Sequence, residues 1–231
     1  MVMTTLSRHC SARARLASTA LAGAALLAAS GAVVPALVSS STAAAAAVTS
    51  SSHQRLQQGA HRVVHHDPRR DVRRFDIRAD TSRPAPRNRA TDVVRTVVDH
   101  RAHQVVVQTR ARQLSRSGYR LMVAQVRTSD GRRYELLVDY STTPIGPRIS
   151  LEQTGSGRTV RCPAAAWSLD RSDHRIRAAV PTRCLGRPGW VRVGVALVAA
   201  PRSLRTSLAD DSRTRGHVGD RLTLGPRQPR A

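Results

Sequence analysis

From Asp71 onward the chain alternates short β-branched runs with turn residues, at a spacing of about ten positions that is typical of antiparallel β-proteins. The run Arg133 to Tyr140 is the clearest example, because every second residue in it is apolar or aromatic. Such alternation gives a strand one apolar face and one polar face. No stretch after residue 47 has the 3.6-residue period of an amphipathic helix. The sequence therefore predicts an all-β protein, a single two-layer antiparallel β-sandwich of about nine short strands.

The same pattern predicts how the chain is divided. Asp130-Gly131 lies between two β runs and predicts a tight hairpin, and the turn at His100 to Ala102 predicts another. The strand pattern occupies residues 68–200, which we take as one domain. Residues 48–67 are polar and without a period, so we expect a flexible leader there. The Arg-rich residues 201–231 break the pattern and predict a mostly extended C-terminal tail.

The first 47 residues have the order of charge and hydropathy that is typical of an export signal. Three arginines precede the uncharged stretch Leu16 to Val38, and an alanine-rich run ends at Ala47. This order predicts a cleaved secretory signal peptide over residues 1–47 and a secreted, extracellular protein. An uncleaved membrane anchor is the alternative, because the stretch is long enough to cross a bilayer. Its small residues and Pro35 favour cleavage, after which we expect no stable membrane insertion.

Cysteine usage predicts one covalent link. Cys10 leaves with the signal, so Cys162 and Cys184 remain as an even pair in an oxidising compartment. We expect them to form a disulfide, and a loop of this size stabilises a fold by about 3 kcal/mol in the chain-entropy model. No Cys-x-x-Cys or Cys/His spacing accompanies them, which argues against a metal or redox site.

The protein is strongly basic, and all of its 38 basic residues are arginine. Beyond residue 47, 35 arginines outnumber 15 acids by 20. Such a surface attracts polyanions, although arginine spread over solvent faces can also reflect composition alone. The strand phases place five arginines on outer sheet faces as candidate anion-binding residues: Arg95, Arg110, Arg112, Arg133 and Arg192. Six aromatic residues provide few stacking platforms for single-stranded nucleic acid, so we expect no specific nucleic-acid partner.

Candidate catalytic and metal-binding residues are sparse. Asp99, His100 and His103 cluster at the first hairpin and could perform acid–base chemistry. No serine in a G-x-S-x-G context accompanies them, so a capped strand end is the favoured interpretation and no enzyme is predicted. The cluster His61 to Asp67 is interpreted as a solvated leader. The pairs Asp170/Asp173 and Asp210/Asp211 could bind calcium together with backbone carbonyls, but a calcium loop needs more oxygen ligands than they provide. They are interpreted as turn residues, so we predict no metal site and no cofactor.

Four segments carry a resemblance to a known group of proteins. They are D-V-x-x-x-D-I at Asp71 to Ile77, V-D-H-R at Val98 to Arg101, Y-E-L-x-V-D at Tyr134 to Asp139 and V-P-T-R-C-L-G-x-P-x-W-V-R-V at Val180 to Val193. Together they resemble secreted actinobacterial β-sandwich proteins of unknown function. The resemblance covers residues 71–198 and implies an export signal, a β-sandwich and one disulfide. It assigns no functional residues.

These observations lead to one expected function and two alternatives. We expect a secreted, monomeric, non-catalytic protein with a binding or structural role at the bacterial cell envelope. Its partners would be cell-wall polymers or other envelope proteins. The first alternative is an electrostatic binder of anionic polymers, either teichoic acid or extracellular nucleic acid. The second is an envelope hydrolase that uses Asp99, His100 and His103.

Overall fold

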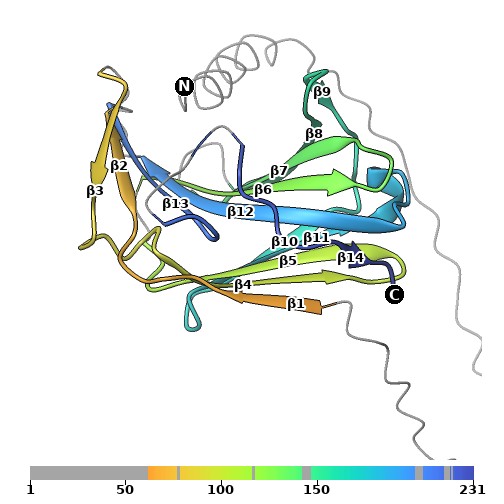
Figure 1. The fold of residues 1–231 in the computed structure, drawn as a ribbon, viewed down its shortest axis with the longest axis horizontal. Coiled ribbons are helices and arrows are strands. Elements are labelled where there is room, and N and C mark those ends of the chain that lie inside the picture. The colour runs from red at the N-terminus through yellow and green to blue at the C-terminus, as the bar shows by residue number, and fades with distance from the viewer. Residues whose placement is uncertain are drawn as a thin grey trace, which may run out of the picture.

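The computed structural model describes residues 62–76, 79–115, 118–141, 147–200, 205–215, 219 and 221–231. The predicted signal peptide and most of the predicted leader lie outside the described residues. The described chain folds into two antiparallel sheets that pack face to face (Figure 1). The prediction of an all-β protein is therefore confirmed. Within the described residues, no helix is both long and apolar enough to span a bilayer.

The smaller sheet contains five strands and forms one layer of the sandwich. In spatial order they are β1 (Arg62–His66), β4 (Val93–His100), β5 (Gln104–Ala111), β11 (Arg175–Pro181) and β10 (Ala166–Asp170). The hairpin predicted at His100 to Ala102 joins β4 to β5, with His100 paired to Val105. A short 3₁₀ helix, η1 (Thr182–Leu185), leads from β11 toward the other layer.

The larger sheet contains nine strands. Eight of them follow the order β3 (Thr81–Pro84), β2 (Arg73–Asp76), β13 (Thr206–Asp211), β12 (Trp190–Ala200), β6 (Tyr119–Thr128), β7 (Arg133–Asp139), β8 (Arg148–Gln153) and β9 (Arg158–Thr159). The ninth, β14 (Gln228–Pro229), pairs with the beginning of β12. The Asp130-Gly131 turn joins β6 to β7, as the sequence predicts.

The main hydrophobic core lies between the sheets and is built from the inward face of each strand. β4 and β5 contribute Val98, Val105 and Val107, and β7 and β12 contribute Leu136 and Val193, all essentially inaccessible to solvent. Burying a side chain of this size stabilises the fold by about 1.5–3 kcal/mol. The apolar face predicted for the run Arg133 to Tyr140 is confirmed, because Tyr134, Leu136, Val138 and Tyr140 are all buried.

The predicted disulfide is present. Cys162 and Cys184 are bonded, with their Cα atoms 5.9 Å apart. The bond links the segment between β9 and β10 to η1, and both cysteines pack against the main core. The bond therefore joins the segment that leads from β9 in the larger sheet to β10 in the smaller sheet with the 3₁₀ helix that follows β11.

The sandwich extends beyond residues 68–200 in both directions. β1 lies in the segment interpreted as a leader, and β13 and β14 lie in the segment interpreted as an extended tail. The interpretation of the tail was wrong for β13, which pairs with both β12 and β2. Its end, Asp210 and Asp211, is charged yet buried, so its sequence does not show an apolar strand pattern. The described residues form fourteen strands instead of nine because several short strands are defined only by backbone pairing.

Candidate functional site

Two of the five predicted anion-binding arginines are brought together on the smaller sheet. Arg95 on β4 lies opposite Arg110 on β5, and Arg110 lies opposite Arg175 on β11. All three belong to the outer face, because the alternate residues on these strands are buried. Arg175 is partly neutralised, since it forms ion pairs with Asp170 at 2.8 Å and with Asp173 at 3.3 Å.

Two other predicted arginines hold the chain in place. The Arg112 guanidinium donates a hydrogen bond to the buried Asp92 carboxylate at 2.8 Å. Arg192 donates through Nε to the carbonyl of Gly225 at 2.7 Å and through Nη2 to the carbonyl of Leu224 at 3.2 Å. The Arg192 contacts fix the segment that passes over β12, and the Arg112 contact holds the residue that precedes β4. Removing either arginine would therefore change the fold as well as the surface charge.

Arg133, the fifth predicted residue, belongs to a row of three arginines on the outer face of the larger sheet. Arg192 on β12 lies opposite Arg127 on β6, and Arg127 lies opposite Arg133 on β7. We call Arg127, Arg133 and Arg192 the arginine row. Sequence analysis missed Arg127, although the alternation in β6 puts it in the outward phase. Like charges directly opposite one another on adjacent strands destabilise a sheet, so this row carries an electrostatic cost.

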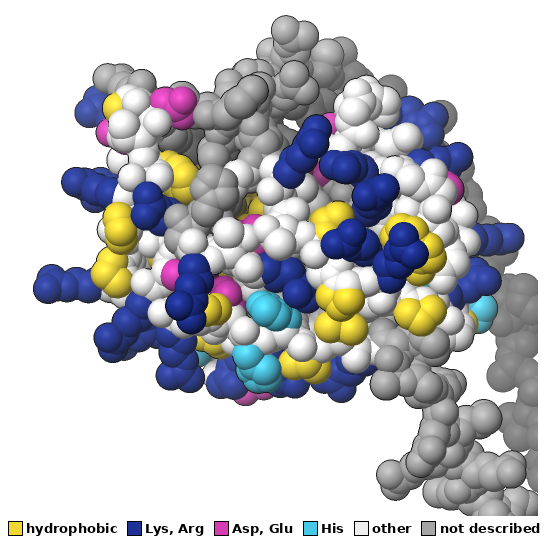
Figure 2. Space-filling view, in the orientation of Figure 1, with side chains coloured by type: hydrophobic (Ala, Val, Ile, Leu, Met, Phe, Trp, Pro, Cys, Tyr) yellow, Lys and Arg dark blue, Asp and Glu magenta, His cyan; other side chains and the backbone are white. Residues whose placement is uncertain are grey.

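Basic side chains surround this region. Arg227 stacks over the ring of Trp190, 4.7 Å from its centroid, and Trp190 lies two positions before Arg192 on the same strand. Figure 2 shows basic side chains at many places on the visible face, with several over the half of the molecule where β12 begins and β14 lies. Acidic side chains are few on this face, so anions would approach it favourably.

The three candidate catalytic residues do not share a surface. Asp99 and His100 are neighbours on β4 and therefore point to opposite faces of the sheet. Asp99 pairs with Arg101 at 2.7 Å on the outer face. His100 is fully buried, with its Nδ1 3.0 Å from the carbonyl oxygen of Gln228. His103 is exposed in the turn. The position of His100 is that of a core residue.

A second candidate site, absent from the sequence analysis, is a cluster of three carboxylates. Asp67 follows β1, Asp71 precedes β2, and Asp210 lies on β13. One oxygen from each lies within 4.8 Å of the corresponding oxygens of the other two. We call these residues the carboxylate cluster. They meet because the chain crosses from the smaller sheet to the larger one between β1 and β2, beside the end of β13.

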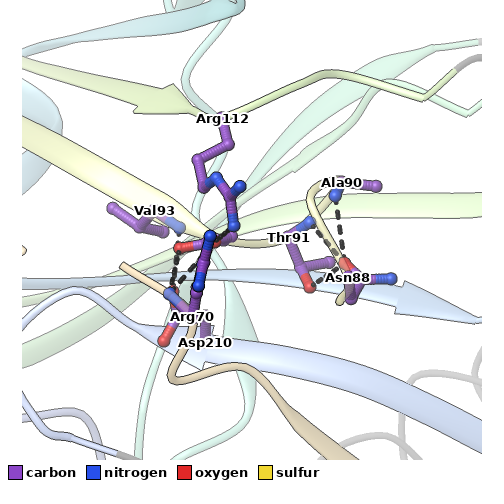
Figure 3. A network of polar contacts seen from close by, with 8 residues as sticks. Arg70, Asn88, Ala90, Thr91, Val93, Arg112 and Asp210 are labelled. Carbon is purple, nitrogen blue, oxygen red and sulfur yellow. Dashed lines mark hydrogen bonds and ion pairs between the residues drawn. The ribbon is translucent and has the colours of Figure 1, made fainter. Parts of the chain in front are cut away.

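A hydrogen-bonded network lies next to the carboxylate cluster (Figure 3). The backbone N–H of Arg70 donates to both oxygens of Asp92, at 3.2 and 3.1 Å. The backbone N–H of Val93 donates to Oδ2 of Asp210 at 2.8 Å. Asp92 is fully buried, but these donors and Arg112 compensate its charge. The network fixes the backbone on which the cluster is built.

The electrostatics of the carboxylate cluster are unfavourable. Burial, reinforced by the neighbouring carboxylates, raises the pKa of Asp67 to about 8 and that of Asp210 to about 9. Burial also raises the pKa values of Asp71 and Asp211. The Arg213 guanidinium lowers the pKa of Asp67, but less than burial raises it. The surroundings of the cluster therefore disfavour the ionised form of its carboxyl groups.

The acidic pair Asp170/Asp173 has the contacts of an ordinary turn. Oδ1 of Asp170 accepts hydrogen bonds from the backbone N–H groups of Ser172 and Asp173, both at 3.1 Å. Its other oxygen accepts from Arg175. These donors lower the pKa of Asp170 to about 2. Its oxygens are already occupied, unlike those of the carboxylate cluster.

Comparison with known protein families, with curated proteins and with solved structures found no match to this chain.

Proposed function

We propose that the protein acts outside the cell as a non-catalytic β-sandwich that binds a phosphodiester-containing polymer of the bacterial envelope. The observation that supports this most is the arginine row, in which three arginines lie at matching backbone positions on adjacent strands. Adjacent strands lie about 4.8 Å apart, so the row spans about 10 Å. This arrangement presents a line of cations to an extended anionic chain.

The chemistry of the row favours phosphate as its ligand. Guanidinium groups form charge-assisted, bidentate hydrogen bonds with phosphate oxygens. None of the ion pairs between described residues involves Arg127, Arg133 or Arg192, so their charges are not neutralised by an acid. Arg192 also donates hydrogen bonds to the carbonyls of Gly225 and Leu224, which leaves Arg127 and Arg133 as the main candidates for direct contact with a ligand. A bound polyanion would relieve the repulsion between arginines that lie directly opposite one another.

The aromatic content favours a wall polymer such as teichoic acid over nucleic acid. Proteins that bind single-stranded nucleic acid stack bases on exposed aromatic rings. Tyr134 and Tyr140 are buried in the core, and Arg227 already stacks on Trp190. We therefore propose that the charges of the polymer, and not bases, are recognised.

The test is sedimentation of the exported protein with purified teichoic acid-containing wall fractions at 0.05 M and 0.15 M salt. The double variant Arg127→Gln/Arg133→Gln should weaken binding at 0.15 M by about tenfold or more, because hydrogen bonds to charged groups contribute about 1.5–3 kcal/mol each. The matched control is Arg74→Gln/Arg83→Gln, which removes two exposed arginines that also lie directly opposite one another on adjacent strands.

The control separates recognition from general charge. If the two double variants weaken binding equally, the interaction is nonspecific attraction and the proposal is wrong. Surface attraction of that kind also fades at 0.15 M, where the Debye length is about 8 Å. Tighter binding to single-stranded DNA than to wall polymer at the same salt would reassign the ligand to nucleic acid.

A further inference from the structure

Five buried oxygens of the carboxylate cluster receive no hydrogen bond from another described residue. They are both oxygens of Asp67, both oxygens of Asp71 and Oδ1 of Asp210. The residues are well enclosed, since Asp67 is 7% exposed and Asp210 is 1% exposed. Leaving buried polar groups unsatisfied costs free energy, and the cost is greater for charged groups. Native proteins usually satisfy such groups with a donor, a water or an ion.

Arg213, which acts electrostatically on Asp67, does not satisfy them. Arg213 faces Asp67 and Asp211, yet its guanidinium forms no ion pair with the cluster among the described contacts. Asp211 is satisfied in another way, because it accepts hydrogen bonds from the backbone N–H groups of Arg213 at 3.1 Å and Thr223 at 3.0 Å. The unsatisfied oxygens thus belong to three residues that point toward one another.

We infer that Asp67, Asp71 and Asp210 bind one calcium ion that joins the crossover between β1 and β2 to strand β13. Carboxylate oxygens are the ligands that calcium prefers, at distances of about 2.3–2.6 Å. Two oxygens on one calcium ion therefore lie at most about 5 Å apart, which is compatible with the 4.8 Å limit observed here. Magnesium requires shorter distances of about 2.0–2.1 Å and near-ideal octahedral geometry, which this cluster fits less well.

The inferred ion would stabilise the sandwich at the place where the chain changes sheets. Asp67 is attached to the smaller sheet, because its backbone N–H donates to the carbonyl of Val94 on β4 at 3.3 Å. Asp210 belongs to the larger sheet. A cation between them would link the two layers, and water or backbone carbonyls would supply the remaining ligands. Extracellular calcium modules bind with dissociation constants of about 0.1–1 mM, which we expect here.

The experiment measures the melting temperature of the mature exported chain after treatment with EDTA and after addition of calcium or magnesium. Calcium should raise the melting temperature by about 5 °C or more at concentrations well above the dissociation constant. Magnesium at the same ionic strength should raise it much less. Equilibrium dialysis should find one calcium ion per chain.

The decisive variant is Asp210→Asn, because an asparagine oxygen can still accept the hydrogen bond from Val93. It replaces a carboxyl that is protonated in the calcium-free folded protein with a neutral amide of the same shape. The EDTA-treated variant should therefore melt close to the wild-type temperature, and the calcium-dependent rise should disappear. Asp71→Asn tests the same site at a partly exposed position. Asp173→Asn is the matched control, because it neutralises an exposed carboxylate that is not part of the cluster. This control should keep the full calcium response.

Three results would overturn the inference: a wild-type melting temperature that calcium does not change, a response kept by both cluster variants, or a magnesium response equal to that of calcium. The inference is independent of the proposed function. Asp210→Asn should bind wall polymer as the wild type does, and Arg127→Gln/Arg133→Gln should keep the calcium response.

Discussion

Two buried aspartates show that neighbouring hydrogen-bond donors, and not burial alone, decide whether a buried carboxylate is stabilised. Asp92 is fully buried and receives hydrogen bonds from the backbone of Arg70 and from Arg112. Asp67 is almost as buried, and its carboxylate receives no hydrogen bond from another described residue. Burial therefore raises the pKa of Asp67 strongly. Because the folded state binds this proton more tightly than the unfolded chain does, the stability of the fold depends on pH.

This difference predicts the pH dependence of the calcium-free protein. In the folded state Asp67 and Asp210 keep their protons up to about pH 8 and about pH 9, whereas in the unfolded chain they lose them near pH 4. Since the folded state binds more protons between these values, its free energy of unfolding should fall as pH rises from 5 to 8. A group that takes up one whole proton on folding changes the free energy of unfolding by at most about 1.4 kcal/mol per pH unit.

Urea unfolding in EDTA at pH 5, 6.5 and 8 measures that slope. Asp71 and Asp92 act on both groups with negative charge. Asp211 adds to this effect at Asp67, where Arg213 opposes it. Asp210→Asn should make the slope shallower than in the wild type, whereas Asp173→Asn should leave it unchanged. A wild-type slope of the opposite sign, or one that Asp210→Asn does not alter, would contradict this account.

At the scale of elements, the sequence could predict the strands that have one apolar face. β7 and β12 alternate clearly because their inward residues, such as Leu136 and Val193, fill the core. β13 could not be found in this way, since its pairing with β12 and β2 buries Ser207, Asp210 and Asp211. Backbone hydrogen bonds to two neighbours, and not apolar alternation, define this strand.

The disulfide is the element-scale feature with a direct stability prediction. Replacing both Cys162 and Cys184 with serine should lower the free energy of unfolding by about 2–4 kcal/mol, because the bond restricts the unfolded chain. Urea denaturation of the oxidised wild type and the double variant measures the difference. The wild type treated with a reductant should match the variant. Two reactive thiols in the exported, folded protein would show that the bond does not form there.

At the scale of the whole molecule, the candidate sites could be predicted only in part. The outward arginines Arg95, Arg110 and Arg133 follow from strand phase alone. The carboxylate cluster does not, because Asp67 and Asp210 are distant in sequence and come together only through the order in which strands join the two sheets. No local spacing of acids indicates such a site.

Export is the prediction that concerns the whole chain. The basic start, uncharged stretch and alanine-rich run predict that the protein in the medium or wall fraction begins between Ala43 and Ser50. N-terminal sequencing of that fraction measures the cleavage position. A membrane-bound protein that retains Met1 would show that the stretch Leu16 to Val38 acts as an anchor.

The position of β13 between β2 and β12 also determines when the sandwich can be completed during synthesis. The hairpin of β2 and β3 is made early, yet β2 joins the larger sheet only through β13, which is made after every other long strand. Until residues 206–211 have emerged, this hairpin and Asp71 have no strand to pair with. Pairings between segments so distant in sequence form slowly. A chain made from its N-terminus would therefore leave this edge of the larger sheet incomplete until almost all of the chain had been synthesised.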